Sequence, residues 1–309
     1  EGGAPGPPPP TPFETEELAL RELRATIQHK QSPAAQALGA FLRAPATTQH
    51  ITGKADDRTN IIDQNARVTY ALPPEAEESL ADLLERGRKE GVANHFSERQ
   101  GTPAAPACGI MLDFDLVVPG RDTRAAERDL HRIALRVAAA LHRDLVFPPE
   151  ALRRGGATVH VFTTLKAAPT PLPGGGFKYG FHFLVPGVWV SRGYKKYLVR
   201  ELRQDPAVAG VLAALGARGD PGACLDPGSA SVPVLFLGSC KRGGHPYGLG
   251  PAFEVAFEAA PPGGRGDFFP IIRVLGPEDL APYNLVAELA LCSEARRPGG
   301  ALVRAHLCE

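Results

Sequence analysis

The chain has 309 residues, 43% of them hydrophobic, and its 34 Lys and Arg residues are balanced by 34 Asp and Glu residues. This length and composition suffice for one large globular domain or two small ones. Because the formal net charge is zero, the chain lacks the overall basic charge of many non-specific DNA-binding proteins. Any contact with nucleic acid must therefore come from a local patch.

The cysteines and the hydropathy pattern indicate the cellular compartment in which we expect the protein. The five cysteines form no Cys-x-x-Cys pair and show no zinc signature, so we expect a reducing compartment without a disulfide framework. The sequence shows no signal peptide and no apolar run long enough to span a bilayer. We therefore expect a soluble, intracellular protein without membrane contact. The way the chain begins and ends suggests a fragment of a larger protein.

The N-terminal third is predicted to be mainly helical. Residues 1–12 are rich in Gly and Pro and are predicted to be a disordered linker, followed by an N-terminal helical segment over residues 13–94. Leucines at helical spacing and acidic-to-basic polarity indicate the individual helices. Helices are predicted over residues 14–29, 33–42 and 74–89, with one short strand over residues 67–71.

Residues 95–275 mix strands and helices without strict alternation, which favours an α+β fold over a doubly wound sheet. A Gly/Pro-rich turn separates two of the strands, which are predicted to form a hairpin. Residues 276–309 are expected to be a C-terminal tail or the start of a linker. Strands are predicted over residues 109–118, 158–165, 177–185, 232–237, 253–257 and 268–275, and helices over residues 122–142, 191–203 and 207–215.

Two aspartates interrupt the first of these strands. Side chains alternate along a strand, so Asp113 and Asp115 share one face while Leu112, Phe114 and Leu116 point to the other. Two neighbouring carboxylates repel each other and lose hydration, and a hard divalent cation such as Mg²⁺ or Mn²⁺ would relieve both costs. The alternative is a strand end whose aspartates face water or cap a turn.

Further candidate residues follow along the chain. The strand over residues 177–185 places Lys178, Gly180 and His182 on one face, where Gly180 leaves room for a ligand; a hydrogen-bonded core histidine is the alternative. Asp226 precedes Pro-Gly and, taken alone, reads as a turn residue. A Gly-rich segment, residues 238–244, offers backbone amides and charge to an anion, although an ordinary basic turn is equally compatible. Its donors include Ser239, Lys241 and Arg242.

The order and spacing of these motifs resemble the archaeo-eukaryotic primase superfamily. A Leu-Asp-Phe-Asp-Leu strand is followed by a Gly-x-His strand, an aspartate and a Gly-Ser-x-Lys loop. The similarity covers roughly residues 95–247. It is greatest to the primase domains of primase-helicases from nucleocytoplasmic large DNA viruses, with herpesvirus primases more distant.

The resemblance implies a fold and a chemistry. Residues 95–275 would be the primase catalytic domain, an α+β fold with a mixed sheet, an RRM-like catalytic unit and flanking helices. Asp113, Asp115 and Asp226 would hold two divalent ions, Mg²⁺ or Mn²⁺, for the attack of a 3′-hydroxyl on an α-phosphate. The incoming nucleotide would be gripped by His182, Ser239 and Lys241, with Lys178 and Arg242 as additional basic groups.

The resemblance also implies partners and a setting. These would be a single-stranded DNA template, nucleoside triphosphates, a helicase domain beyond this fragment and other replisome proteins. The setting would be viral DNA replication in the host cytoplasm or nucleus. The sequence departs from the family pattern after Asp226, where Pro-Gly stands in place of the common Val-Tyr, and before residue 238, where an arginine is missing.

Two other functions are compatible with parts of this sequence. A haloacid-dehalogenase-like phosphatase also places its nucleophile on an Asp-x-Asp strand, but the usual Gly-Thr after this motif is replaced by Leu116-Val117. A catalytically inert primase-like module would only bind nucleic acid. Such a module has no use for a buried acidic pair facing DNA phosphates.

Overall fold

The computed structural model describes residues 32–52, 59–92, 94–100, 107–146, 157–167, 169–241, 246–257, 270–291, 303–304 and 306–307. The helix predicted over residues 14–29 lies outside these residues, as does Arg242. Within the described part no helix has the length and apolar character needed to cross a bilayer.

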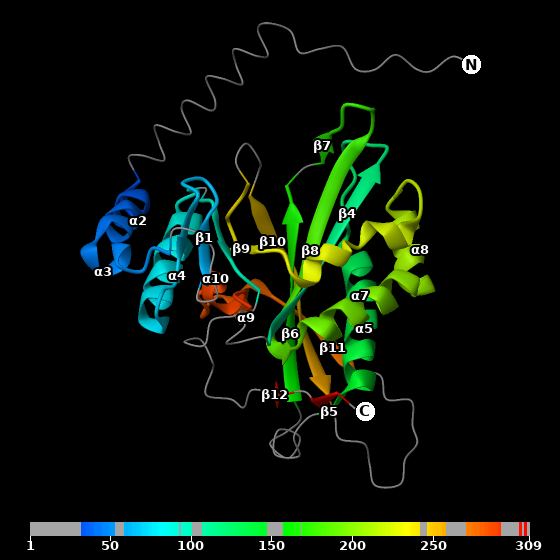
Figure 1. Ribbon diagram of the computed structural model, residues 1–309. Helices are drawn as coiled ribbons and strands as arrows, with labels where there is room; N and C mark the ends of the chain where they lie inside the picture. The colour runs from blue at the N-terminus through cyan, green and yellow to red at the C-terminus, as the bar shows by residue number, and fades with distance from the viewer. Residues whose placement is uncertain are drawn as a thin grey trace, which may run out of the picture.

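A large, mainly antiparallel sheet forms the centre of the structure and stands upright in Figure 1. Its strands follow the spatial order β11-β10-β6-β8, and β4 pairs with β8. The predicted hairpin is confirmed, because β6 and β8 pair antiparallel. Short strands β7 and β12 add to β8. The strand bounds are β4 (Cys108–Val118), β6 (Ala157–Lys166), β7 (Thr170–Pro171), β8 (Phe177–Val190), β10 (Tyr247–Phe257), β11 (Ile271–Leu275) and β12 (Val303–Arg304).

One face of this sheet is covered by helices and forms the main core. Phe114, Phe181 and Phe183 point into it from β4 and β8, and the rings of Phe114 and Phe181 stack at a centroid distance of 5.0 Å. The covering helices lie on the right of the sheet in Figure 1. They are α5 (Glu127–Asp144), α7 (Arg192–Gln204) and α8 (Pro206–Ala214).

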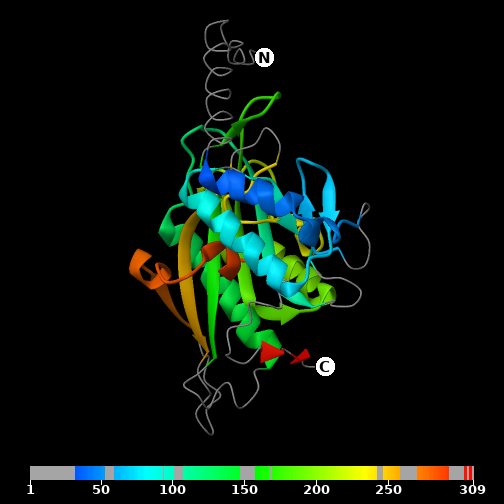
Figure 2. The same cartoon turned by 90° about the vertical axis from the view of Figure 1, so that its left-hand side faces the viewer.

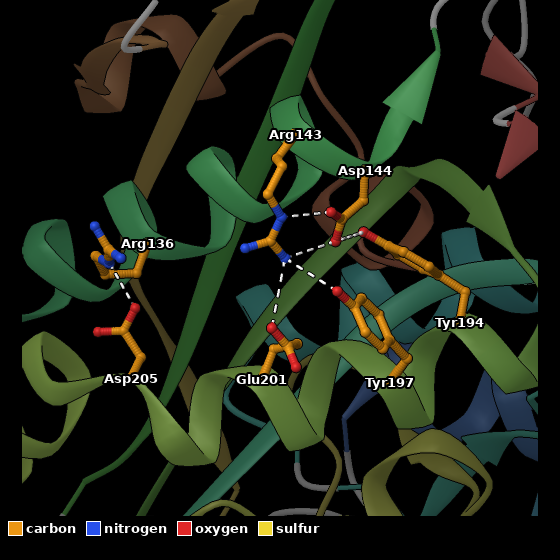
Figure 3. Close-up of polar contacts among 7 residues, drawn as sticks. All are labelled: Arg136, Arg143, Asp144, Tyr194, Tyr197, Glu201 and Asp205. Atoms are coloured by element: carbon orange, nitrogen blue, oxygen red, sulfur yellow. Dashed lines mark hydrogen bonds and ion pairs between the residues drawn. The ribbon is translucent and has the colours of Figure 1, made fainter. Parts of the chain in front are cut away.

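Polar contacts tie α5 to α7 and to the start of α8 on the outer side of this layer (Figure 3). The Arg136 guanidinium donates to Asp205 at 2.7 Å, and Asp205 also caps α8 by accepting from the Ala207 amide. Because these groups are partly exposed, they orient the helices more than they stabilise them. Further along α5, Arg143 contacts Asp144, Tyr197 and Glu201.

The opposite sheet face is covered at one end by an N-terminal layer. We use this name for a four-stranded sheet of order β2-β1-β3-β9 and the helices packed with it, seen from their own side in Figure 2. Strand β9 joins this layer from a distant part of the chain. The strands are β1 (Ile61–Asp63), β2 (Val68–Tyr70), β3 (Phe96–Glu98) and β9 (Val234–Leu235), and the helices are α2 (Pro33–Arg43), α3 (Pro45–Thr48), α4 (Pro74–Lys89), α9 (Pro277–Leu280) and α10 (Leu285–Glu288).

Several elements differ from the sequence-based expectations. Helix α5 begins at Glu127, because Thr123 bonds the Gly120 carbonyl in a turn after β4 instead of capping a helix. The expected C-terminal tail contains α9 and α10. Val286 on α10 and Leu291 beyond it are fully buried in a second core, which lies between the N-terminal layer and the sheet face that this layer covers. Two-residue strands β5 (Leu145–Val146) and β13 (His306–Leu307) also pair. The α+β class itself is confirmed.

Candidate active site

A change from apolar to polar side chains along one sheet face defines the site. Where the N-terminal layer covers the sheet, the cross-strand neighbours are Met111, Leu184 and Phe162. Two residues further along each strand, the neighbours on the same face become Asp113, His182 and Thr164. The site therefore begins at the edge of the second core.

His182 is held between β4 and β6. Its Nε2 atom lies 3.3 Å from Asp113 Oδ1, and its Nδ1 atom lies 3.0 Å from Thr164 Oγ1. Its side chain remains 12% exposed. The imidazole is thus hydrogen-bonded, as expected for a core histidine, but it is also partly exposed and faces the Asp113 carboxylate.

The Asp113 carboxylate is largely enclosed and ionised. Burial raises the pKa of Asp113, but the contact with His182 and the positive charges of Lys178 and Lys241 outweigh this effect, so the pKa is lowered. Its Oδ1 atom is buried and has no assigned hydrogen bond within the described structure, and His182 Nε2 lies 3.3 Å from it. An ionised oxygen without a donor is well suited to a cation.

Asp115 lies beside Asp113 and pairs with a lysine from β8. Lys178 Nζ is 2.8 Å from Asp115 Oδ2, and both side chains are partly exposed. The space expected above Gly180 is closely bordered: a Cβ atom there would lie 3.0 Å from Asp115 Oδ1 and 3.2 Å from the Tyr247 hydroxyl. The missing side chain therefore makes room for protein groups of the site itself.

Asp226 lies next to the aspartate strand through its backbone. Its amide donates to the Asp113 carbonyl at 2.8 Å. Its carboxylate accepts from the Gly228 amide at 2.7 Å and caps the 3₁₀ turn η2 (Pro227–Ala230). Asp226 therefore has the turn role predicted from the sequence, and it also lies next to Asp113.

The Gly-Ser-Cys-Lys segment after β9 is attached to the N-terminal layer. Ser239 is fully buried and its hydroxyl donates to the Asn94 side chain, while the Cys240 amide donates to the Asn94 carbonyl at 2.9 Å. His95 Nδ1 donates to the Cys240 carbonyl at 2.7 Å. Ser239 therefore anchors the segment, and Lys241 is left exposed with its charge acting on Asp113.

Gly238 takes a backbone conformation that favours glycine where this segment meets α4. It has φ of +79°, and a Cβ atom would lie 3.0 Å from Cγ of Arg88 on α4. We expect Gly238→Ala to lower the free energy of unfolding by about 1–3 kcal/mol, because a side chain is strained in this conformation. Denaturant unfolding measures this. Gly174→Ala is the control, since nothing lies within 4 Å of its added Cβ; equal losses in both variants would refute the argument.

Sequence reasoning missed three side chains of the site. Thr164 contacts His182, and the Tyr247 ring stacks on the His182 ring at a centroid distance of 4.2 Å. Lys166 Nζ lies over the Tyr247 ring, 5.8 Å from its centroid. Alternation along β6 places Thr164 and Lys166 on one face, and this signal was available in the sequence.

The donor set fits a divalent cation only in part. Among the described residues, no group of three or more His, Cys, Asp or Glu side chains is arranged as a metal site. Two carboxylates on one strand face remain, Asp113 and Asp115, one of them with a buried oxygen that lacks a hydrogen bond. These oxygens suit Mg²⁺ or Mn²⁺, while the Asp226 carboxylate bonds Gly228.

Comparison with known proteins identifies relatives over most of the chain. Residues 59–252 match the model of the C962R protein N-terminal AEP domain family, AEP standing for archaeo-eukaryotic primase. The chain is 35% identical to "Putative primase C962R" of African swine fever virus, strain Badajoz, over 295 residues. The Pig/Kenya/KEN-50 isolate gives the same identity and length. Each alignment covers 94% of this chain but 27% of the relative, so the chain spans about a quarter of these proteins.

Proposed function

The chain belongs to the C962R N-terminal AEP domain family, and from this premise we propose that it synthesises primers on single-stranded DNA by metal-dependent nucleotidyl transfer. Its substrates would be nucleoside triphosphates and the template strand. A helicase domain outside these 309 residues would be a partner, in keeping with the greater length of the relatives, and other replisome proteins would be further partners.

One observation carries the proposal: two carboxylates lie on one sheet face, with a histidine and a lysine of β8 beside them and a further lysine from the segment after β9. Asp113 contacts His182, Asp115 contacts Lys178, and Lys241 acts from the segment after β9. Carboxylate oxygens bind metal ions, whereas lysine ammonium groups bind anions. A metal-bound triphosphate satisfies both requirements.

The residues have distinct roles in this scheme. Asp113 and Asp115 would hold the metal ions, with Asp226 joining them if its carboxylate leaves Gly228. When held by these carboxylates, divalent ions would supply Lewis-acid activation for the 3′-hydroxyl and for the pyrophosphate leaving group. Lys178 and Lys241 would bind phosphate oxygens and offset their charge. His182, fixed by Thr164, would hold its Nε2 atom toward the carboxylates and the nucleotide phosphates.

The two other functions are less well supported. The haloacid-dehalogenase-like phosphatase is not favoured by the relatives found. An inert binding module would place ionised Asp113 against DNA phosphates, which is unfavourable without a metal ion. The test is primer synthesis from labelled nucleotides on single-stranded DNA with Mg²⁺ or Mn²⁺. Short products that vanish on chelation are expected, and metal-independent DNA binding without nucleotide binding would favour the module.

Lys178 and a metal ion would compete for Asp115. We expect Lys178→Met to raise the affinity for Mn²⁺, in the absence of nucleotide, by about two- to fivefold, because an exposed ion pair contributes up to about 1 kcal/mol. Mn²⁺ titration followed by electron paramagnetic resonance measures this. Lys196→Met, on the exposed side of α7, is the control. Unchanged or weaker Mn²⁺ binding by Lys178→Met would contradict the competition.

A further inference from the structure

Lys166 and Tyr247 lie beside the carboxylates but belong to none of the motifs that identify the site. They are cross-strand neighbours on β6 and β10. We propose that both belong to the nucleotide site, Lys166 as a third lysine that binds the triphosphate and Tyr247 as a positioning residue for His182. This inference rests on the proposed function and extends it to residues that the sequence motifs do not include.

Lys166 is an unneutralised cation within the site. Within the described structure its ammonium forms no ion pair, and it lies over the Tyr247 ring, 5.8 Å from the ring centroid. Burial lowers the pKa of Lys166; the charges of Asp115 and Asp113 oppose this effect, and those of Lys178 and Lys241 add to it. Lys166 is therefore within electrostatic reach of both carboxylates and both other lysines.

This charge arrangement selects the class of ligand. Of the three lysines, Lys178 alone has a carboxylate ion pair in the described structure, so Lys166 and Lys241 lie near Asp113 and Asp115 without a paired carboxylate of their own. Like charges raise one another's free energy, and a half-buried ammonium also loses hydration. An anion with several negative oxygens relieves both costs. The polyphosphate of a nucleotide has this charge and length.

Tyr247 fixes the His182 ring from a third direction. Thr164 contacts the Nδ1 atom and Asp113 the Nε2 atom, while the Tyr247 ring covers the imidazole plane at 4.2 Å and 25°. Its hydroxyl reaches the space above Gly180. Burial and the nearby carboxylates raise the pKa of Tyr247, so the hydroxyl stays neutral. The ring is therefore expected to matter more than the hydroxyl.

The test for Lys166 separates phosphate binding from catalysis. We compare Lys166→Gln, Lys166→Arg and the control Lys196→Gln in binding tripolyphosphate and a fluorescent nucleoside triphosphate with Mn²⁺. Lys166→Gln should weaken both affinities and raise KM about tenfold with kcat within about twofold, since a charge-assisted hydrogen bond to the triphosphate would be lost. Lys166→Arg should recover most of the binding. Affinities of Lys166→Gln equal to those of Lys196→Gln would overturn this part.

The test for Tyr247 uses the two halves of its side chain. Tyr247→Phe keeps the ring and should retain kcat and nucleotide KM within about twofold, whereas Tyr247→Leu should lower kcat/KM about tenfold or more, because His182 would lose its orientation toward the nucleotide phosphates. Thermal unfolding of both variants checks the fold. Equal activities of the two folded variants would overturn the positioning role. If the wild-type chain binds no nucleotide in the presence of metal, the proposed function fails as well. If the wild type binds nucleotide and only the variants behave otherwise than expected, the roles of Lys166 and Tyr247 alone fail.

Discussion

Replacing Asp113 and Asp115 together by asparagine is expected to lower primer synthesis roughly 10³-fold or more, because a single preorganised charge-stabilising group already contributes about 10²–10³-fold. Asparagine keeps the volume of each side chain but removes both negative charges. The Lys178 ion pair and the ionised state of Asp113 would be lost with them. Primer synthesis on single-stranded DNA with Mg²⁺ or Mn²⁺ measures the effect.

Folding should survive this double replacement. Both side chains are partly accessible, with 19% and 33% of their surface exposed, so no apolar contact of the core is removed. Thermal unfolding of the variant is the control, and the cooperative transition should remain. Primer synthesis at the wild-type level by the folded double variant would contradict the metal-carboxylate mechanism. Loss of both the transition and the activity would call for the two single variants.

Phe114→Ala is expected to lower the free energy of unfolding by about 3–5 kcal/mol. Phe114 lies between the two aspartates in sequence but points into the main core, where it is fully buried. Its ring stacks on Phe181 and meets the edge of Phe183 at 5.7 Å. Truncation therefore leaves a cavity beneath the paired strands β4 and β8 and removes two aromatic contacts.

The matched control for Phe114→Ala lies on the other face of the same strand. Val117 is 38% exposed, so Val117→Ala should change the free energy of unfolding by less than about 1 kcal/mol. Denaturant unfolding at equilibrium measures both variants. Similar losses of unfolding free energy in the two variants would contradict the assignment of Phe114 to the buried face of β4 and of Val117 to the exposed face.

The parts of the fold with a clear periodic pattern could be predicted from the sequence. Helix α4 has the predicted bounds, since Pro74 opens it and its charges follow the helix dipole. Ser191 caps α7 as expected, accepting from the Tyr194 amide. Strict alternation around Phe114 was sufficient to assign Asp113 and Asp115 to one face.

The tertiary pairings that complete the site could not be read in the same way. Strand β10 begins at Tyr247, six residues before the strand predicted at Phe253, because glycines and a proline weaken its sequence signal. The stacking of Tyr247 on His182 depends on pairing between distant strands. The burial of Ser239 follows from its contact with Asn94, which is 145 residues away in sequence.

The most direct test of the central claim is equilibrium binding of a labelled nucleoside triphosphate, with Mn²⁺ and with chelator, by the wild-type chain and the Asp113→Asn/Asp115→Asn variant. This measurement does not need the remainder of a longer replication protein. Our account predicts that the wild type binds the nucleotide with Mn²⁺, and that chelation or the double replacement reduces this binding at least tenfold. Binding of equal strength in all four conditions, or no binding in any, would contradict a metal-nucleotide site at these carboxylates.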